Sequence, residues 1–556
     1  DAFKPSDKFQ LLTNDFEGRH QRLVNKEEFL NLVDEITISP AVKKISEVIS
    51  RQQDLLLKQE EQNKFAFIIS DFQKSITDVE TWRNDSLVRV RMLPVAVGRG
   101  NNLYIDSCWF ESPVRRAGQI QELMVRVKNA SDVAYENTPV KLIVNGQQKA
   151  PASIDLAENS SEVISMPFTI SESGLNQGVV KITDYPVTYD DDFFFSFYVD
   201  ENLPVLIING EKESPYFKSL FGRDDYFILN NVKENNIDYS QFQKNKFIIL
   251  NELKNISSGL AQELKKFTEN GGTMLVVPSK DIDIDSYKTF LNSNNLNYYA
   301  NLDTNDLKVV KINTSHLIFS NVFESIPENL DLPVSNAHYA LVKSSRSGEE
   351  ELLKLQNGDA FLSRYPAGKG FIYLSAVPFS EGFSNFPKHA LFVPVLYNIA
   401  LYSQPQQPMF YTTGSDEMVA NPRPGLQNEI LKITGAHDFE IIPEQRTMDG
   451  KQQLLVHGQI KTAENFKLKS AEETIGGLSF NFDRNESILS YFSADELLIA
   501  IEKYGLKNFA ILNPNQKEVS QALDELNLGR RLWKLCIIFA LVFLLTEIAL
   551  LRFFKS

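Results

Sequence analysis

Cysteine is scarce in this chain of 556 residues, which has only Cys108 and Cys536. Cys536 lies inside an apolar run near the end of the sequence, so the two residues cannot form a disulfide framework. The fold must therefore depend on hydrophobic cores. A hydrophobic content of 43% and a charged content of 23% are ordinary values for a globular protein.

Excess positive charge is also lacking. The formal net charge is -15, and no cluster of Lys and Arg forms a basic stripe. Binding to nucleic acid or to anionic lipid depends on such clusters, so the composition argues against both as partners of the main body.

The common catalytic motifs are missing as well. The sequence has no Gly-rich phosphate loop, no His-Glu-x-x-His, no paired CxxC and no Gly-x-Ser-x-Gly. Its six histidines are scattered and form no spaced set of metal ligands. We therefore expect that the chain is not an enzyme.

One long apolar run is present, from Leu532 to Phe554, with basic residues at both ends. A helix needs roughly 20 apolar residues to cross a hydrocarbon core of about 30 Å, so the run predicts a transmembrane helix. A buried core helix is the alternative. The predicted membrane residues are Leu535, Phe539, Phe543 and Glu547. Glu547 either snorkels at the helix end or faces another membrane helix.

The length of the chain predicts several domains. The predicted fold class is multidomain α/β plus β-sandwich, with one transmembrane helix. The boundaries follow changes of pattern, and the predicted segments are residues 1–98, 99–202, 203–405, 406–528 and 529–556. The first alternates strand and helix and opens as if in the middle of a domain, so we expect a preceding segment.

The three middle segments have different patterns. Residues 99–202 contain short β-type runs and an Asn145-Gly146 turn, which indicate an immunoglobulin-like β-sandwich. Residues 203–405 alternate strands with helices and predict a mostly parallel sheet of flavodoxin or class I glutamine amidotransferase type. Residues 406–528 are mixed and β-rich, with a helix predicted over 494–504. The acidic run Asp190 to Asp192 is interpreted as a charged turn.

Amidotransferase chemistry requires a cysteine thiolate activated by a histidine. Residues 204–403 contain no cysteine, so His338 and His389 have no such nucleophile to activate. We therefore predict that this segment is a non-catalytic relative of that fold.

Asp71 follows the predicted buried strand of residues 65–69. A carboxylate at this position, joined by hydroxyls such as those of Thr37, Ser39 or Ser70, could supply part of a Mg²⁺ site. The alternative is that Asp71 only caps a turn.

Two sets of segments resemble known families. FAFIISDFQ and the run Ile36 to Ser39 resemble the fourth strand and the threonine loop of a von Willebrand factor A domain, whose metal-ion-dependent adhesion site they would help to form. The Asp-x-Ser-x-Ser motif of that family is absent. A second resemblance is to the BatA-type membrane proteins of Bacteroidota. It rests on the order of the segments LLTNDFEGRHQRLVNKEEF, IISDFQKS, NLYIDSCWFESP, YDDDFFFSF and SNFPKHALFVPVLYNIALY.

The resemblance implies an inner-membrane protein with its soluble body in the periplasm and a link to aerotolerance or envelope stress. Its partners would be other membrane or periplasmic proteins. The functional expectation is an interaction or scaffold protein. The alternatives are a small-ligand sensor or hydrolase-like enzyme using residues 203–405, and metal-dependent adhesion through Asp71.

Overall fold

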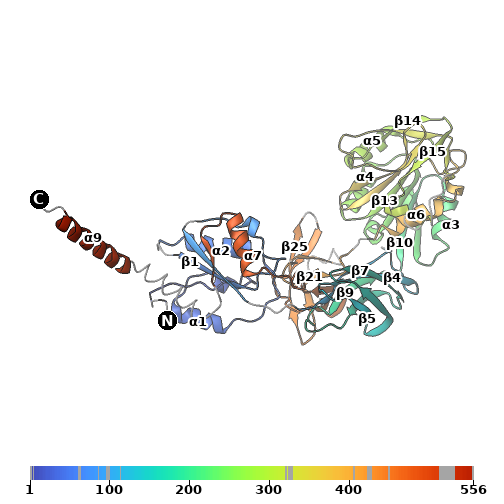
Figure 1. Ribbon diagram of the computed structural model, residues 1–556. Coiled ribbons are helices and arrows are strands. Elements are labelled where there is room, and N and C mark those ends of the chain that lie inside the picture. Colours follow the sequence, from blue (N-terminus) through green and yellow to red (C-terminus); the bar gives the residue numbers. More distant parts are fainter. Residues whose placement is uncertain are drawn as a thin grey trace.

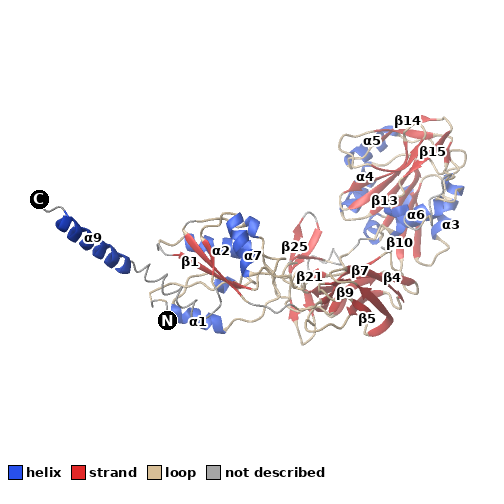
Figure 2. Ribbon diagram, in the orientation of Figure 1, coloured by secondary structure: helices blue, strands red, loops and turns tan. Residues whose placement is uncertain are grey.

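The computed structural model describes most of the chain. The described residues are 3, 6–60, 64–85, 87–95, 100–112, 114–319, 322–323, 330–404, 407–416, 418–421, 429–448, 451–512 and 533–553. Figure 1 shows an elongated arrangement with an α/β unit at one end and helix α9 (Trp533–Phe553) at the other. Strands dominate the middle of the molecule, as Figure 2 shows.

The N-terminal unit is built on a three-stranded parallel sheet in the order β1-β2-β29. One face of the sheet carries the core, in which α2 and α7 bury Ile49, Leu497 and Ile501 against Ile68 and Val90. The helices and strands of this unit are η1 (Gly18–His20), α1 (Lys26–Asp34), α2 (Ile45–Leu57), β1 (Lys64–Ser70), η2 (Val79–Thr81), β2 (Val88–Pro94), α7 (Ala494–Lys503) and β29 (Phe509–Ile511).

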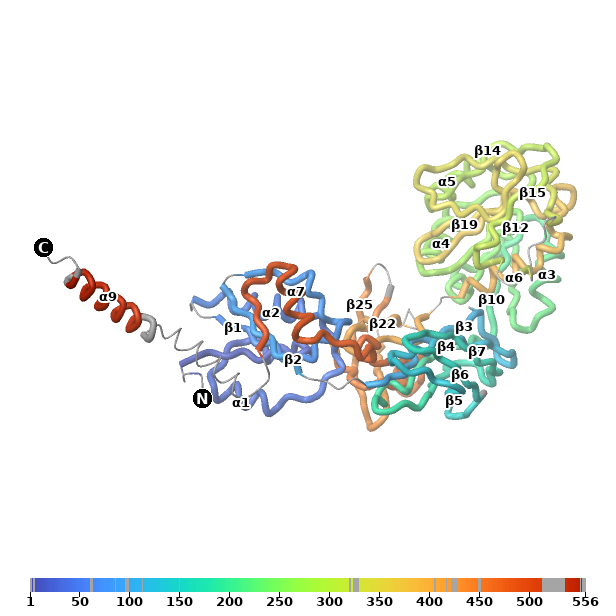
Figure 3. Tube along the Cα trace, viewed as in Figure 1, coloured from blue at the N-terminus to red at the C-terminus, as the bar shows by residue number. Residues whose placement is uncertain are grey.

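Residues 494–511 return to this sheet from the far end of the chain. Strand β29 pairs with β2 in parallel, with Val90 opposite Phe509. A capping box formed by Ser493 and Glu496 fixes the start of α7. Figure 3 shows this orange-red segment lying against the blue N-terminal unit. The sequence pattern grouped the segment with residues 406–528, because periodicity identifies a strand without showing which sheet it joins.

Residues 103–199 form two facing antiparallel sheets, in the orders β3-β4-β7 and β6-β5-β8-β9. Alternate side chains of both sheets point inward and form one core, which includes Cys108. Burial raises the pKa of the Cys108 thiol far above its usual range. The strands are β3 (Leu103–Phe110), β4 (Ile120–Asn129), β5 (Tyr135–Val144), β6 (Gln147–Leu156), β7 (Ser161–Thr169), β8 (Gly174–Lys181) and β9 (Asp192–Val199). We call this body the sandwich.

The next unit, residues 203–404, is an α/β unit with a nine-stranded sheet in the order β11-β10-β12-β13-β20-β19-β18-β15-β16. The strands from β11 to β20 are parallel and the others are antiparallel. Helices α3 and α6 cover one face, and α4 and α5 cover the other.

The first elements of the α/β unit are β10 (Leu203–Asn209), α3 (Pro215–Phe221), β11 (Phe227–Lys233), η3 (Glu234–Asn236), η4 (Tyr239–Lys244), β12 (Phe247–Leu253), α4 (Ser258–Glu269), β13 (Thr273–Pro278), α5 (Ile284–Ser293) and β14 (Tyr298–Asp303). The remaining elements are β15 (Leu307–Ile312), η5 (Leu317–Phe319), β16 (Val334–Ser335), β17 (His338–Val342), β18 (Glu350–Leu355), β19 (Ala360–Ala367), β20 (Gly370–Ser375), η6 (Phe386–Lys388) and α6 (Phe392–Leu401). Strands β14 and β17 pair separately.

Residues 411–481 form two further sheets, in the orders β21-β28-β27-β23-β24 and β22-β26-β25. They share a core that includes Leu454, Phe466 and Phe480. The strands are β21 (Tyr411–Thr412), β22 (Met418–Ala420), β23 (Leu431–Thr434), β24 (Glu440–Ile441), β25 (Glu444–Met448), β26 (Lys451–Leu455), β27 (Glu464–Ser470) and β28 (Glu473–Asn481). Strand β28 lies beside β9 of the sandwich.

The predicted transmembrane helix is wrong. Across the part of the chain that the structure describes, no helix combines the length and the apolar character that crossing a membrane requires. Helix α9 forms, but Lys534, Glu547 and Arg552 leave only residues 535–546 without charge. Such a run rises about 18 Å at about 1.5 Å per residue, which is less than a hydrocarbon core of about 30 Å.

This finding also corrects the predictions of membrane insertion and of an inner-membrane location. Of the predicted membrane residues, Phe539, Phe543 and Glu547 are exposed on α9, and the side chain of Leu535 lies outside the described residues. Phe543 and Glu547 line an open hollow on the helix surface.

The predicted fold class is also wrong. The structure is strand-rich and contains several separate sheets, in place of a von Willebrand A-like α/β domain combined with a transmembrane helix. The N-terminal sheet also depends on β29, which a contiguous domain of residues 1–98 would not contain.

Candidate functional site

The predicted metal-ligating residues have different hydrogen-bond partners in the structure. Asp71 follows β1, and one of its carboxylate oxygens accepts a hydrogen bond from the Ser70 hydroxyl at 3.3 Å. The Ser39 hydroxyl oxygen accepts one from the Ala41 N–H, also at 3.3 Å, and Thr37 is exposed. Within the described ranges no hydrogen bond joins Asp71 to Thr37 or Ser39, and no cluster of three acidic, His or Cys side chains could hold a metal. The Mg²⁺ site at Asp71 with Thr37 and Ser39 therefore stays a prediction.

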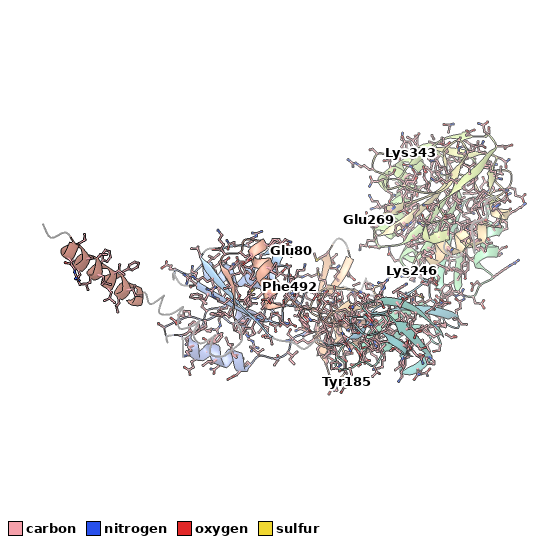
Figure 4. All side chains as sticks on the ribbon, in the orientation of Figure 1. Glu80, Tyr185, Lys246, Glu269, Lys343 and Phe492 are labelled. Carbon is pink, nitrogen blue, oxygen red and sulfur yellow. The ribbon has the colours of Figure 1, made fainter. Side chains whose placement is uncertain are left out.

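A returning protein segment lies at Asp71 instead. Gln73 Nε2 donates to the Glu486 carbonyl oxygen at 3.2 Å, and Ser75 Oγ donates to the Asn485 carbonyl oxygen at 3.1 Å. Burial and the nearby Asp71 carboxylate raise the pKa of Glu486. Phe492, labelled in Figure 4, donates its N–H to the Phe72 carbonyl oxygen at 2.9 Å. This end of the sheet is therefore a contact between distant parts of the chain.

The same returning segment forms a buried junction with the sandwich, which we call the Arg484 junction and define by Asn102, Asp190, Asp192, Arg484 and Ser487. Asn102 Nδ2 donates to Asp190 Oδ2 at 2.8 Å and to the Ser487 carbonyl oxygen at 2.9 Å. Asn102, Asp190 and Ser487 each have 0% exposure. The acidic run that was expected to form a charged turn is thus partly buried.

Arg484 supplies the positive charge of this junction. Its Nε donates to the Ile105 carbonyl oxygen at 2.8 Å, and its Nη2 donates to the Asp192 carbonyl oxygen at 3.1 Å. Burial lowers the pKa of Arg484, and the Asp190 carboxylate opposes this effect. The guanidinium also lies 5.3 Å from the centre of the Phe193 ring. One side chain therefore joins both sheets of the sandwich to the returning segment.

Carboxylates outnumber cations here. Burial, followed by the charges of Asp190 and Asp184, raises the pKa of Asp191 to about 6. Burial also raises the pKa of Asp184. Sequence reasoning missed this junction because Arg484 and Asp190 are far apart in the chain; the only sequence signal was the acidic run itself.

A second junction joins the sandwich to the α/β unit. Arg116 Nη1 and Nη2 donate to the two carboxylate oxygens of Asp224 at 3.0 and 2.8 Å, and Nη1 also donates to the Tyr397 hydroxyl at 2.7 Å. The hydrogen bond from Arg116 is the main cause that lowers the pKa of Asp224 to about 2. Val114 is buried in the core of the α/β unit. We call this contact the Arg116 junction.

The carboxyl ends of parallel strands are where open α/β sheets bind ligands. At this edge Glu252 has a left-handed φ of 54°, which is unusual for a residue other than glycine. Its carboxylate accepts hydrogen bonds from the Ser380 hydroxyl and N–H and from the Phe379 N–H, while burial raises its pKa. A Cβ atom on Gly210 would lie 2.3 Å from the Glu252 carbonyl oxygen, so this close approach requires glycine.

The neighbouring polar groups at this edge bind each other. Asn251 Nδ2 donates to Asn209 Oδ1 at 2.8 Å, and both side chains are buried. His338 and His389, the two histidines named from the sequence, have other hydrogen-bond partners. His338 Nε2 is 2.9 Å from Asp359 Oδ2. His389 Nδ1 accepts a hydrogen bond from the Leu391 N–H at 3.2 Å. Glu252 is therefore a half-buried titratable group that this edge offers for chemistry.

Comparison with known proteins adds little. No protein-family model and no curated protein matches the chain. Among solved structures, the cytoplasmic protein STM1381 from Salmonella typhimurium LT2 is 13% identical, with 36% of this chain and 100% of that chain covered and a TM-score of 0.29. A ThuA-like protein from Bacteroides uniformis is 15% identical, with 39% and 95% covered and a TM-score of 0.27.

The CARDB domain of the PF1109 protein from Pyrococcus furiosus is 16% identical, with 19% and 97% covered and a TM-score of 0.17. Likenesses this weak carry no argument about fold or function. These three solved structures are not von Willebrand A-like or BatA-type proteins, so the comparisons give those two predictions no support.

Proposed function

We propose that this chain is a protein-interaction scaffold that holds its units in a fixed arrangement for binding to other proteins. The main observation in support is the Arg484 junction, in which an arginine guanidinium and a fully buried carboxylate join segments that are distant in sequence. The Arg116 junction gives similar support on the α/β side.

Directional hydrogen bonds between buried polar groups favour one arrangement, because any other leaves those groups without partners in a region of low dielectric. An apolar contact tolerates sliding more readily. The two polar junctions at the sandwich therefore suit a protein whose role is to present surfaces at set distances.

The experiment compares partner recovery by two matched variants. The full-length tagged chain is cross-linked in its native cells, and co-purified proteins are quantified by mass spectrometry. We expect Arg484→Ala to reduce the recovery of specific partners at least tenfold. Arg446→Ala is the control, because Arg446 pairs with Glu444 at an exposed site. Failure of the wild-type chain to recover any specific partner contradicts the proposal, as does equal recovery by Arg484→Ala.

A second candidate function is small-ligand sensing or hydrolase-like chemistry in residues 203–405. The observation that favours it is Glu252, with its left-handed backbone and raised pKa at the ligand-binding edge of a parallel sheet. Thermal shifts with a library of small metabolites test this function. A compound that raises the melting temperature of the wild type but not of Glu252→Gln supports it, and a library without such a compound counts against it.

A further inference from the structure

Helix α9 lies apart from the folded units, at the end of the molecule opposite the α/β unit (Figure 1). Every side chain of α9 that the structure describes is exposed. The exposed fraction is 48% to 58% for the apolar residues Ile537, Phe539, Leu541, Leu544 and Ile548. A helix that is apolar on every side is normally buried, because its surface is unfavourable in water. Contact with another helix would bury part of this surface.

Four apolar residues lie on one side of α9 at the spacing of a coiled coil. Intervals of four, three and four residues separate Ile537, Leu541, Leu544 and Ile548. Residues at these intervals form one stripe along a helix, and two such stripes pack when the side chains of each helix insert into gaps of the other. We call these four residues the α9 stripe. Their spacing suits the pairing of α9 with a second helix.

Two charged residues lie beside the α9 stripe, one on each side. A helix turns about 100° per residue, so Glu547 lies about 80° from the middle of the stripe in one direction and Arg552 about 60° in the other. Side chains three or four residues apart are neighbours on a helix, whereas these two are five apart and point away from each other. No salt bridge within the described part of the chain includes Glu547 or Arg552. Each can therefore pair with a charge on a second helix.

The two charges favour a second copy of α9 in parallel orientation. In a parallel pair, a residue on one flank of the stripe meets the residue five positions later on the other flank of the second helix. Glu547 then meets Arg552 of the second copy, and two-fold symmetry forms this contact twice. In an antiparallel pair equal flanks face each other, so the Glu547 flank would face itself and the ion pair would not form.

A hollow on the Glu547 flank leaves room for the second helix. Ala540, Leu544 and Glu547 contribute to its lining. Ala540 is seven residues before Glu547 and so lies on the same flank. Five positions later is Leu545, so Ala540 would face Leu545 of the second copy. A small residue opposite a large one allows two helices to pack closely.

We propose that α9 pairs with α9 of a second copy of this chain in a parallel two-helix coiled coil, with the α9 stripe at the contact and Glu547 of each copy beside Arg552 of the other. The pairing is independent of the scaffold function, because neither the Arg484 junction nor the Arg116 junction includes residues of α9.

The first test is the mass of the full chain, measured by light scattering after size-exclusion chromatography. We expect twice the 63.2 kDa of one chain. Leu544→Asp should return the chain to a single copy, because it places a charge in the stripe. Phe539→Asp is the matched control and should leave the dimer intact, since Phe539 is as exposed as Leu544, at 54% against 53%, but lies on the far side of the helix. A monomeric wild type, a larger assembly or equal effects of the two variants would overturn the proposal.

Exchange of the two charges tests the ion pair. Glu547→Arg and Arg552→Glu should each weaken self-association about tenfold in sedimentation equilibrium, because each brings like charges together at both symmetric contacts. The double variant that carries both changes should restore the dissociation constant to within about threefold of the wild type. If the double variant is as weak as the single variants, the ion pair is refuted.

A cysteine variant tests the orientation. Ile537→Cys is introduced together with Cys536→Ala, and Cys108 does not compete because it is buried. In a parallel pair residue 537 of one copy meets residue 537 of the other, so mild oxidation should give a covalent dimer. In an antiparallel pair that overlaps along the whole helix the two lie near opposite ends. Phe539→Cys in the same background is the control and should remain uncrosslinked. A dimer without a cross-link at residue 537 would exclude the parallel arrangement.

Discussion

Replacement of Arg484 by methionine gives the sharpest test of the junction between the sandwich and the returning segment. Methionine keeps much of the apolar length of the side chain but removes the charge and all donors. The carbonyl oxygens of Ile105 and Asp192 then lose their hydrogen bonds. The Asp190 carboxylate, with 0% exposure, loses the cation that compensates it. Removing one partner of a buried charged group costs about 3 to 5 kcal/mol, and the half-buried position of Arg484 places the expected loss near 3 kcal/mol.

Hydrogen exchange followed by mass spectrometry measures this loss locally, which matters because a chain of several units does not unfold in one step. A loss of about 3 kcal/mol corresponds to roughly 150-fold faster exchange in peptides that cover β3 and β9. Exchange in the α/β unit should not change. Arg446→Met is the matched control, because Arg446 is exposed and forms its ion pair with Glu444 at the surface.

A double variant separates the charge effect from lost packing. In the Asp190→Asn background the fully buried carboxylate is gone, so Arg484→Met should cost about 1 to 2 kcal/mol less than in the wild type. The reasoning is refuted if Arg484→Met accelerates exchange less than about threefold. It is also refuted if the cost is the same in both backgrounds.

Three other parts of the structure lead to further predictions. Leu497→Ala should destabilise the N-terminal unit by about 2 to 5 kcal/mol, measured by urea unfolding with tryptophan fluorescence, because Leu497 is buried in its core. Leu498→Ala, at an exposed neighbour, should cost under about 0.5 kcal/mol, and equal effects would contradict the packing of α7 on this sheet. Asp191→Asn should raise the melting temperature at pH 7.5 but not at pH 4, and a larger gain at pH 4 would contradict the reasoning. Burial and neighbouring carboxylates raise the pKa of Asp191 to about 6, so the folded state holds this proton more tightly than the unfolded state, and stability falls as pH rises through that range. Gly370→Ala should destabilise the α/β unit by more than about 3 kcal/mol in thermal unfolding, since its Cβ would lie 1.9 Å from the Gly272 carbonyl oxygen, and tolerance of this change would show that the backbone can separate there. The control Gly259→Ala, on the exposed side of α4, should be neutral or slightly stabilising.

Local structure was largely predictable. The helix predicted over residues 494–504 is confirmed as α7, one residue shorter. Asn145 and Gly146 have the positive φ values, 50° and 74°, that their turn requires. These features depend on periodicity, caps and turn chemistry within a few residues, so they can be derived from the sequence.

Helix α9 shows how little one stretch can decide about a membrane span. The apolar run does form a helix, and its length and flanking basic residues suggested a span, but the charged positions near its ends interrupt the apolar surface. The metal site at Asp71 stays a prediction. Asp71 follows a strand as expected, yet the loop that carries Thr37 and Ser39 is not joined to it, and the 483–492 segment contacts that end of the sheet instead.

By itself, the sequence determined the position of many helices, strands and turns, the scarcity of disulfide-forming cysteines and the acidic balance of the chain. Only the tertiary structure decided that residues 494–511 complete the first sheet, that Asp190 is buried against Asn102 and Ser487, and that Glu252 adopts a left-handed backbone beside Gly210. The physical reason is range. Hydrogen bonding and side-chain periodicity act over a few residues and leave a pattern in the sequence, whereas burial of a charge depends on groups that folding brings together from distant positions.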